Sequence, residues 1–219
     1  MVSQRLAAVA STFPDPAELE RRLRIVTIIE AVTDAGDFCH YYYSNTNSNS
    51  HFRHAYFDSG SGDHARIIFG DHLTFIRAFD HESYLNPWVR GRIWPGILHN
   101  MPNQFRQFMV HDSGEITAAL WHVGIGWDHG DPEPLPNGQE PDPTFWMFSD
   151  VVNVVDDFSA HAVAEGFSIH TGIEIHPEAM RPFLYEQPLT QRIIQLVNSD
   201  ARPKYIHEVA TTAGYPSQL

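Results

Sequence analysis

The sequence predicts an α+β protein in which an antiparallel sheet of four or five strands packs against helices, with a helical C-terminal third. Three observations support this prediction. Aromatic and β-branched runs alternate with turn-forming residues between positions 38 and 79, an apolar stripe at helical spacing follows position 15, and proline-initiated apolar segments fill the last third. Short strands joined by polar turns favour antiparallel pairing. With 219 residues, 42% of them hydrophobic, the chain can form one globular domain with a sizeable core.

The first expected element is a helix over residues 16–32. Asp15 is a suitable N-cap, Pro16 occupies the first helical position, and Glu18 provides the acid of a capping box. Strands are then predicted over four runs that are rich in aromatic or β-branched residues: 38–44, 52–58, 65–69 and 73–79. Ser, Asn, Gly and Asp separate these runs, so we expect an antiparallel meander.

The second half of the chain is expected to be less regular at first and then helical. Prolines and glycines argue against a strand in residues 80–100, and a short helix over 103–110 and a strand over 116–123 follow. Five prolines and five acidic residues occupy positions 124–143, which should form a long surface loop because proline excludes regular pairing. Helices are then predicted over residues 144–165, 177–184, 189–198 and 204–213.

The charge is distributed very unevenly. Between Arg106 and Arg181 there is no lysine or arginine, yet this stretch holds thirteen acidic residues. Residues 1–110 contain 11 acids and 10 bases, and residues 111–219 contain 16 acids and 4 bases, so the second half supplies almost all of the net charge of −13. Such a field repels phosphate, and no nucleic-acid-binding motif is present, so nucleic acid is not expected as a partner.

The sequence is also expected to be that of a cytoplasmic protein. The first residues contain only a five-residue apolar run, too short for the core of a signal peptide, and no segment reaches the roughly 20 apolar residues that span a bilayer. The lone Cys39 cannot form an internal disulfide, agrees with a reducing compartment, and is interpreted as a small buried hydrophobic residue.

Fourteen histidines raise the question of a metal site, but their spacing does not match known ligand patterns. The local clusters are the pair His51 and His54, and the acidic loop, where Asp128, Asp131 and Glu133 offer oxygen ligands without the order of a calcium loop. We interpret the loop as a solvated acidic surface. No metal and no cofactor are therefore expected.

One short run combines several chemically active groups. Asp80, His81, Glu82 and Ser83 bring two carboxylates, an imidazole and a hydroxyl to the end of a predicted strand, where functional groups concentrate. They can act as catalytic or ligand-binding residues, or they can form hydrogen bonds that hold residues 80–96 to the core. Ser83 lacks the Gly-x-Ser-x-Gly context of a nucleophile elbow.

The five tryptophans all lie between residues 88 and 146. Trp121 and Trp146 fall on predicted regular elements and are expected in the core. Trp88, Trp94 and Trp127 fall in loops, where each can anchor a partner protein or pin its own loop to the surface.

The run FIRAFDHESYLNPW followed by WPGILHNMPNQF, over about residues 75–105, resembles a pattern in uncharacterised soluble bacterial proteins. The resemblance implies a bacterial cytosolic origin and a structural or functional role for residues 79–83. In charge and expected architecture, the chain is also similar to small acidic α+β proteins that neutralise toxins, a likeness that no shared motif carries.

These observations lead to two hypotheses. The first is an acidic protein-binding module, an immunity or antitoxin-type inhibitor of a basic toxin domain, because opposite fields accelerate encounter. Its expected contact residues come from the acidic stretch and its tryptophan: Trp127, Asp128, Asp131, Glu133, Asp150, Asp156 and Asp157. The alternative is a small-molecule or metal-dependent enzyme that uses Asp80, His81 and Glu82 as acid, base or ligand residues.

Overall fold

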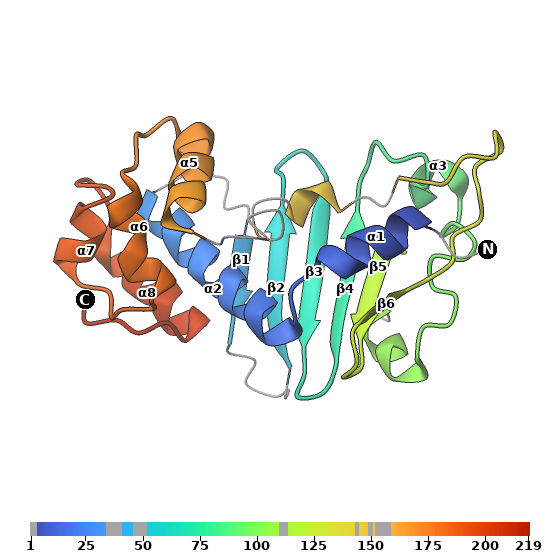
Figure 1. Ribbon diagram of the computed structural model, residues 1–219, viewed down its shortest axis with the longest axis horizontal. Coiled ribbons are helices and arrows are strands. Elements are labelled where there is room, and N and C mark those ends of the chain that lie inside the picture. Colours follow the sequence, from blue (N-terminus) through green and yellow to red (C-terminus); the bar gives the residue numbers. More distant parts are fainter. Residues whose placement is uncertain are drawn as a thin grey trace.

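The computed structural model describes residues 4–33, 41–45, 52–109, 114–142, 145–148, 151 and 159–219. Within these ranges a six-stranded sheet has its strands in chain order, each antiparallel to the next (Figure 1). This arrangement confirms the predicted α+β class and the meander. The strands are β1 Tyr41–Ser44, β2 Arg53–Asp58, β3 His64–Phe69, β4 Thr74–Phe79, β5 Ala118–His122 and β6 Trp127–His129.

The sixth strand lies in the stretch predicted to be loop throughout. Residues 127–129 pair with residues 120–122 of β5, so the prediction of a continuous loop over residues 124–143 was wrong at this point. The prolines that exclude pairing begin only at Pro132. Before them, Gly124 and Gly126 adopt positive φ angles of 96° and 136°, which reverse the chain and return it along β5.

Two helices cross one face of the sheet (Figure 1). Helix α2, Pro16–Thr33, begins where the sequence predicted, and Oδ1 of Asp15 accepts hydrogen bonds from the backbone N–H groups of Ala17 and Glu18. Helix α1, Gln4–Thr12, was not predicted. Only Leu6 and Ala10 of this helix are buried, so its apolar signal is short.

Further helices form the C-terminal part and pack beside α2 (Figure 1). The single helix predicted over 144–165 was wrong in its bounds, because Ser159 caps a helix that begins at residue 160. Residues 146–148 form a 3₁₀ turn, and residues 149–150 and 152–158 lie outside the described ranges, as does Cys39. The helices are α5 Ala160–Thr171, α6 Pro177–Leu184, α7 Gln191–Gln195 and α8 Pro203–Ala213.

Apolar side chains cover both faces of the sheet. One face packs against α1, α2 and the C-terminal helices, with Leu23, Ile67 and Phe183 in the same cluster. The other face is covered at β3–β5 by the segment that contains α3, Pro87–Arg90, and the 3₁₀ helix η1, Asn103–Met109. Phe105 and Trp121 are fully buried in this second cluster. None of the described helices combines the length and apolar character needed to span a bilayer.

Candidate functional site

The turn after β4 brings together residues from two hairpin ends. His64, the first residue of β3, pairs with Phe79, the last residue of β4. Continuing this register by one residue places Asp63 beside Asp80. The Asp80–Ser83 run therefore meets an acid that lies far from it in the sequence but directly across the sheet end.

Asp63 binds His81 twice. Its Oδ1 accepts a hydrogen bond from the backbone N–H of His81 at 2.9 Å and lies 2.7 Å from the ring Nδ1, while its Oδ2 accepts one from Oγ of Ser59 at 3.1 Å. Asp63 is 6% exposed. A carboxylate that is bonded to Nδ1 orients the imidazole and leaves Nε2 to act elsewhere, which is the orienting relationship found in acid–base catalysis.

The contact between Asp63 and His81 changes the pKa values of the two side chains in opposite directions. Burial raises the pKa of Asp63, but the hydrogen bonds from His81 and Ser59 outweigh it, and the net pKa is lowered. The hydrogen bond with Asp63 raises the pKa of His81, against a smaller opposing effect of desolvation. The two shifts together stabilise an ion pair between carboxylate and imidazolium.

Asp80 is occupied by hydrogen bonds within the turn. Its Oδ1 accepts from the backbone N–H groups of Glu82 and Ser83 at 2.8 and 3.0 Å, and its Oδ2 accepts from the indole of Trp146 at 3.2 Å. Asn86 Nδ2 donates to the carbonyl of His81 at 2.6 Å. These contacts are the kind of network that holds residues 80–96 to the core, the second of the two roles considered from the sequence.

Asp63, Asp80 and His81 form the one cluster among the described residues whose spacing suits a metal ion. Ligand atoms of Asp63, Asp80 and His81 lie within 4.8 Å of one another, a spacing that suits a cation. Both oxygens of each carboxylate already accept hydrogen bonds, so a cation would have to displace them. The side chain of Glu82 is 86% exposed, and its Oε1 lies 3.9 Å from Nε2 of His81.

The acidic loop is held to the rest of the protein at several points. The backbone N–H of Asp131 donates to the carbonyl of Gly96 at 2.9 Å, and that of Glu133 donates to Pro95 at 3.0 Å. In return, the indole N–H of Trp94 donates to the carbonyl of Glu133 at 2.8 Å. Residues 131–133 are therefore positioned by a ladder of hydrogen bonds rather than by a regular element.

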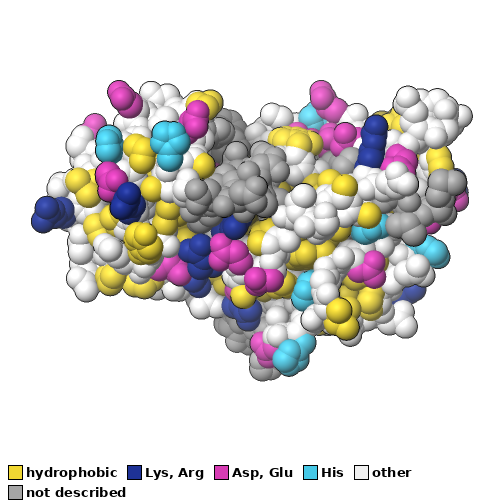
Figure 2. Space-filling view, viewed as in Figure 1, with side chains coloured by type: hydrophobic (Ala, Val, Ile, Leu, Met, Phe, Trp, Pro, Cys, Tyr) yellow, Lys and Arg dark blue, Asp and Glu magenta, His cyan; other side chains and the backbone are white. Residues whose placement is uncertain are grey.

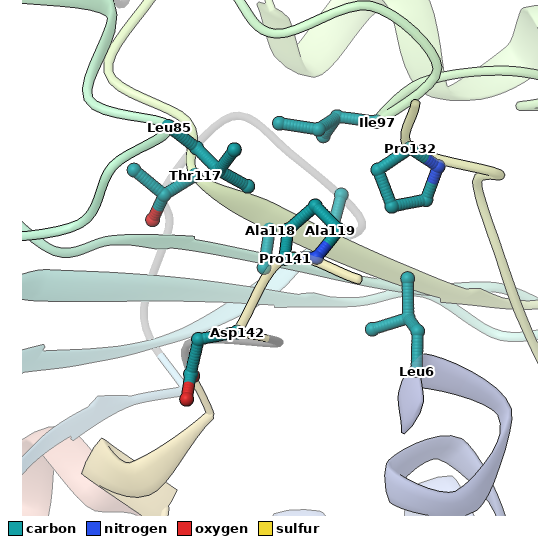
Figure 3. Close-up of a pocket in the computed structure, with 9 residues that line it drawn as sticks. All are labelled: Leu6, Leu85, Ile97, Thr117, Ala118, Ala119, Pro132, Pro141 and Asp142. Atoms are coloured by element: carbon teal, nitrogen blue, oxygen red, sulfur yellow. The ribbon is translucent and has the colours of Figure 1, made fainter. Parts of the chain in front are cut away.

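The far end of the loop is fixed to α1. The carboxylate of Glu140 accepts hydrogen bonds from the backbone N–H groups of Gln4 and Arg5 at 3.1 and 3.0 Å, which caps this helix. Leu6, Pro132 and Pro141 converge around a small cavity of about 10 Å³ (Figure 3). That volume is at the lower limit for one water molecule, so the junction is a packing contact and no site for an organic ligand.

An open groove of about 470 Å³, the acidic groove, lies where the acidic loop meets residues 93–99. Trp94, Asp131 and Glu133 all line it, so one groove contains an aromatic ring and two carboxylates. The cation of the neighbouring helix is engaged elsewhere: Arg90 donates from Nε to the carbonyl of Tyr84 at 3.0 Å, and its guanidinium lies 3.6 Å from the centre of the Tyr84 ring. The lining residues are Ile93, Trp94, Gly96, Leu98, His99, Asp131 and Glu133.

The predicted partner-binding residues differ in exposure, and some lie outside the described ranges. Asp128 and Glu133 are exposed and Asp131 is half-buried. Trp127 is half-buried, its indole N–H donates to the carbonyl of Pro14 at 2.7 Å, and its ring packs on the core, so it pins its own loop. Asp150, Asp156 and Asp157 lie outside the described residues.

Three other tryptophans lie at or near the surface, and one of them was expected in the core. Trp146 is 51% exposed, so the prediction that it belongs to the core was wrong, because its indole reaches out to Asp80. Trp88 is 63% exposed and rests on Phe79 with ring centres 4.9 Å apart. Trp94, by contrast, joins the acidic groove. The sequence signal for this was only its position in a loop, since its partner Glu133 lies 39 residues away.

Acidic side chains do not form one continuous patch on the side of the molecule that carries α1 and α2 (Figure 2). On the side that carries α1 and α2, they lie toward both ends of the molecule and mingle with arginines near α2 (Figure 2). There, Arg21 pairs with Glu18 at 2.7 Å and Arg24 pairs with Glu186. The acidic groove is thus a local feature within a generally acidic protein.

Comparison with models of protein families, with curated proteins and with solved structures gives no match for this chain.

Proposed function

We propose that this protein is a binding module that receives a lysine or arginine side chain of a basic partner protein, in the manner of an immunity or antitoxin-type inhibitor of a toxin domain. The observation that supports the proposal is the groove that Trp94 lines together with Asp131 and Glu133, whose backbone N–H groups are held by hydrogen bonds. An aromatic face and carboxylates are the two groups that bind an organic cation most strongly.

Preorganisation makes this groove more favourable than a flexible acidic tail. The backbone of residues 131–133 is already held by hydrogen bonds to Gly96 and Pro95, so little conformational entropy is lost on binding. The acidic field of the second half of the chain would accelerate encounter with a basic protein and disfavour acidic ones. Asp128, which is exposed three residues before Asp131, would contribute to this field at the rim.

The test uses a defined cationic probe, a hexa-arginine amide, with association followed by stopped-flow tryptophan fluorescence. Wild type should bind saturably, with an on-rate that falls steeply between low and physiological ionic strength. The variant with Asp131→Asn and Glu133→Gln should associate about tenfold more slowly, because rim charges act mainly on the on-rate. A thermal melt of the variant checks that it is folded.

A matched control carries Glu165→Gln and Glu174→Gln, two exposed acids on or after α5. It has the same change in net charge outside the groove and should associate at the wild-type rate. Equal slowing in both variants, or an on-rate that ignores salt, would contradict a specific groove and leave only a solubilising surface. Purification of the natural partner from the host, followed by the same comparison, then tests the inhibitor role itself.

A second candidate, an enzyme centred on Asp80, His81 and Glu82, is favoured by the contact between Asp63 and His81. In that case His81 would act as the general base, Asp63 would orient it, and Asp80 would supply a second carboxylate as an acid or ligand. Comparison of Asp80→Ala with Asp80→Asn separates this role from a structural one.

A further inference from the structure

The second face of the sheet carries a feature of opposite character to the acidic loop. Ile68, Phe75 and Trp121 on this face are covered by the second hydrophobic cluster. Toward β1 and β2 the same face instead bears polar and aromatic side chains. Strand registers place Tyr42 opposite Tyr56, Tyr56 opposite Arg66, and Arg66 opposite Arg77, so these side chains form one row across four strands.

This row forms the floor of an open groove of about 420 Å³. Two arginines, two histidines and one glutamate line it, which gives it a positive character in a protein of net charge −13. The carboxylate of Glu115 lies 3.3 Å from Nε2 of His64, at one side of the groove. The lining residues are Tyr42, His54, Ala55, Tyr56, His64, Arg66, Arg77 and Glu115.

The arginines are placed to act together on one anion. Arg77 is only 4% exposed, and Arg66 lies directly across the strand pair from it. Opposed residues of neighbouring strands project to the same face of the sheet, so both arginine side chains line this groove. Guanidinium groups bind phosphate and carboxylate with paired hydrogen bonds, and such bonds are strongest where water is excluded.

Histidines and tyrosines complete the groove with flat surfaces. The ring of His64 stacks on Tyr56 with centres 6.2 Å apart and an interplanar angle of 21°. Tyr42 and Tyr56 are 44% and 38% exposed, so their rings are open to a ligand. Nδ1 of His54 is buried and makes no hydrogen bond to any of the described residues, which leaves a polar atom for a ligand to satisfy.

We propose that this groove binds a small molecule in which an anionic group, phosphate or carboxylate, lies between Arg66 and Arg77 and a planar ring lies against Tyr42 and Tyr56. This site is separate from the acidic groove, and the proposal does not depend on the proposed function. The ring and the anion are each matched by a group of residues on the floor of the same groove, which distinguishes the site from a scatter of surface arginines.

Calorimetric titration of the full chain with four probes tests the proposal: phenyl phosphate, benzoate, inorganic phosphate and phenol. One of the two ring-bearing anions should bind at least tenfold more tightly than inorganic phosphate and than phenol, and the tighter of the two identifies the anionic group. Binding should also shift the NMR signals of the His54 and His64 rings. Equal affinity for phenol and for both ring-bearing anions would overturn the proposal.

Variants locate the site. Arg66→Gln should lower the affinity for the tighter-binding of the two ring-bearing anions about tenfold or more, because charge-assisted hydrogen bonds are lost. Arg66 is half-buried, so this variant is expected to fold where Arg77→Gln can fail. Arg192→Gln on α7 makes the same charge change at an exposed site outside the groove and should bind like wild type. Tyr42→Ala should lower the affinity for the ring-bearing anions but not the affinity for inorganic phosphate. Wild-type affinity in Arg66→Gln, or an equal loss in Arg192→Gln, would place the binding elsewhere.

Discussion

Gly96 and Gly130 allow two irregular segments to meet backbone against backbone. A Cβ atom on Gly96 would lie 2.0 Å from the carbonyl oxygen of Asp131, and one on Gly130 would lie 2.1 Å from that of Ile97. Neither position has room for a side chain, because the obstructing atoms belong to the backbone. This contact sets the position of Asp131 and therefore the shape of the acidic groove.

Gly130→Ala should destabilise the protein by about 3 kcal/mol, because overpacking against a fixed backbone forces the segments apart. Chemical denaturation measures this loss, and the fluorescence of Trp94 should change as its groove opens. Gly166→Ala is the matched control, since Gly166 lies in α5 with no atom near the added Cβ. It should stabilise by about 0.5–1 kcal/mol through the entropy of the unfolded chain. Similar losses in both variants would contradict the close contact.

Asp63→Asn should lower the pKa of His81 toward its usual value of 6.5, because the hydrogen-bonded carboxylate that raises it becomes neutral. NMR titration of the His81 ring measures the shift. Glu82→Gln, which removes an exposed carboxylate 3.9 Å away, should lower the same pKa much less. A pKa of His81 that is unchanged in Asp63→Asn would show that the pair does not form in solution.

The same pair predicts a pH window for stability. A raised pKa for His81 contributes stability below about 6.5 that is lost as the pH rises through the folded value. A lowered pKa for Asp63 contributes stability above 3.8 that is lost as the pH falls through the folded value. The difference in melting temperature between wild type and Asp63→Asn should therefore be largest near about pH 5 and should shrink toward alkaline pH. A difference that grows with pH would contradict this sign.

Glu18 makes a second pH-dependent contribution. Its hydrogen bond with Arg21 lowers its pKa from 4.5 to about 2, with Arg22 acting in the same direction and burial opposing. The stability from this carboxylate is present above pH 4.5 and is lost as the pH falls toward 2. Glu18→Gln should cost about 1 kcal/mol at neutral pH after allowance for solvent screening, with Glu174→Gln as an exposed control. Urea unfolding at neutral and acidic pH measures both, and a cost that persists below pH 2 would have another cause.

Substitutions of Asp80 distinguish a structural role in the turn from a role as a reactive carboxylate. Asp80→Ala removes acceptors for three hydrogen bonds and should cost about 1–2 kcal/mol of stability. Asp80→Asn retains an acceptor for the backbone N–H groups of Glu82 and Ser83, so its stability should stay near that of wild type. Thermal melts compare the two. If any enzymatic activity or cation binding is found, its loss in the stable Asp80→Asn variant would favour the enzyme hypothesis instead.

Local patterns carried the prediction of the sheet and of several helices. The strands from β2 to β4 follow runs of aromatic and β-branched residues, and helix α2 follows a cap, a proline and an apolar stripe. Each of these signals is contained within a few neighbouring residues. The sequence analysis missed helix α1 and strand β6 because their signals are short: α1 buries only Leu6 and Ala10, and β6 has three residues.

The sequence predicted only part of each candidate site, because some of the site residues become neighbours only through strand pairing. The Asp80–Ser83 run is conspicuous in the sequence, but its buried partner Asp63 becomes adjacent only through the register of the β3–β4 hairpin. That register could have been extended by one residue from the two predicted strands. The row from Tyr42 to Arg77 needs the register of four strands at once. A shift of a single residue would turn these side chains to the opposite face.

The sequence by itself determined the α+β class, the order of the strands, and the acidic field of the second half of the chain, because periodicity, turn chemistry and charge are properties of the residues themselves. The tertiary structure alone decided which tryptophan lines the groove with Asp131 and Glu133. Trp127, next to them in sequence, bonds to Pro14, while Trp94 bonds to Glu133 across 39 residues. Such contacts depend on where two irregular segments cross, and at that crossing the allowed distance is set by glycines and backbone hydrogen bonds that no local pattern encodes.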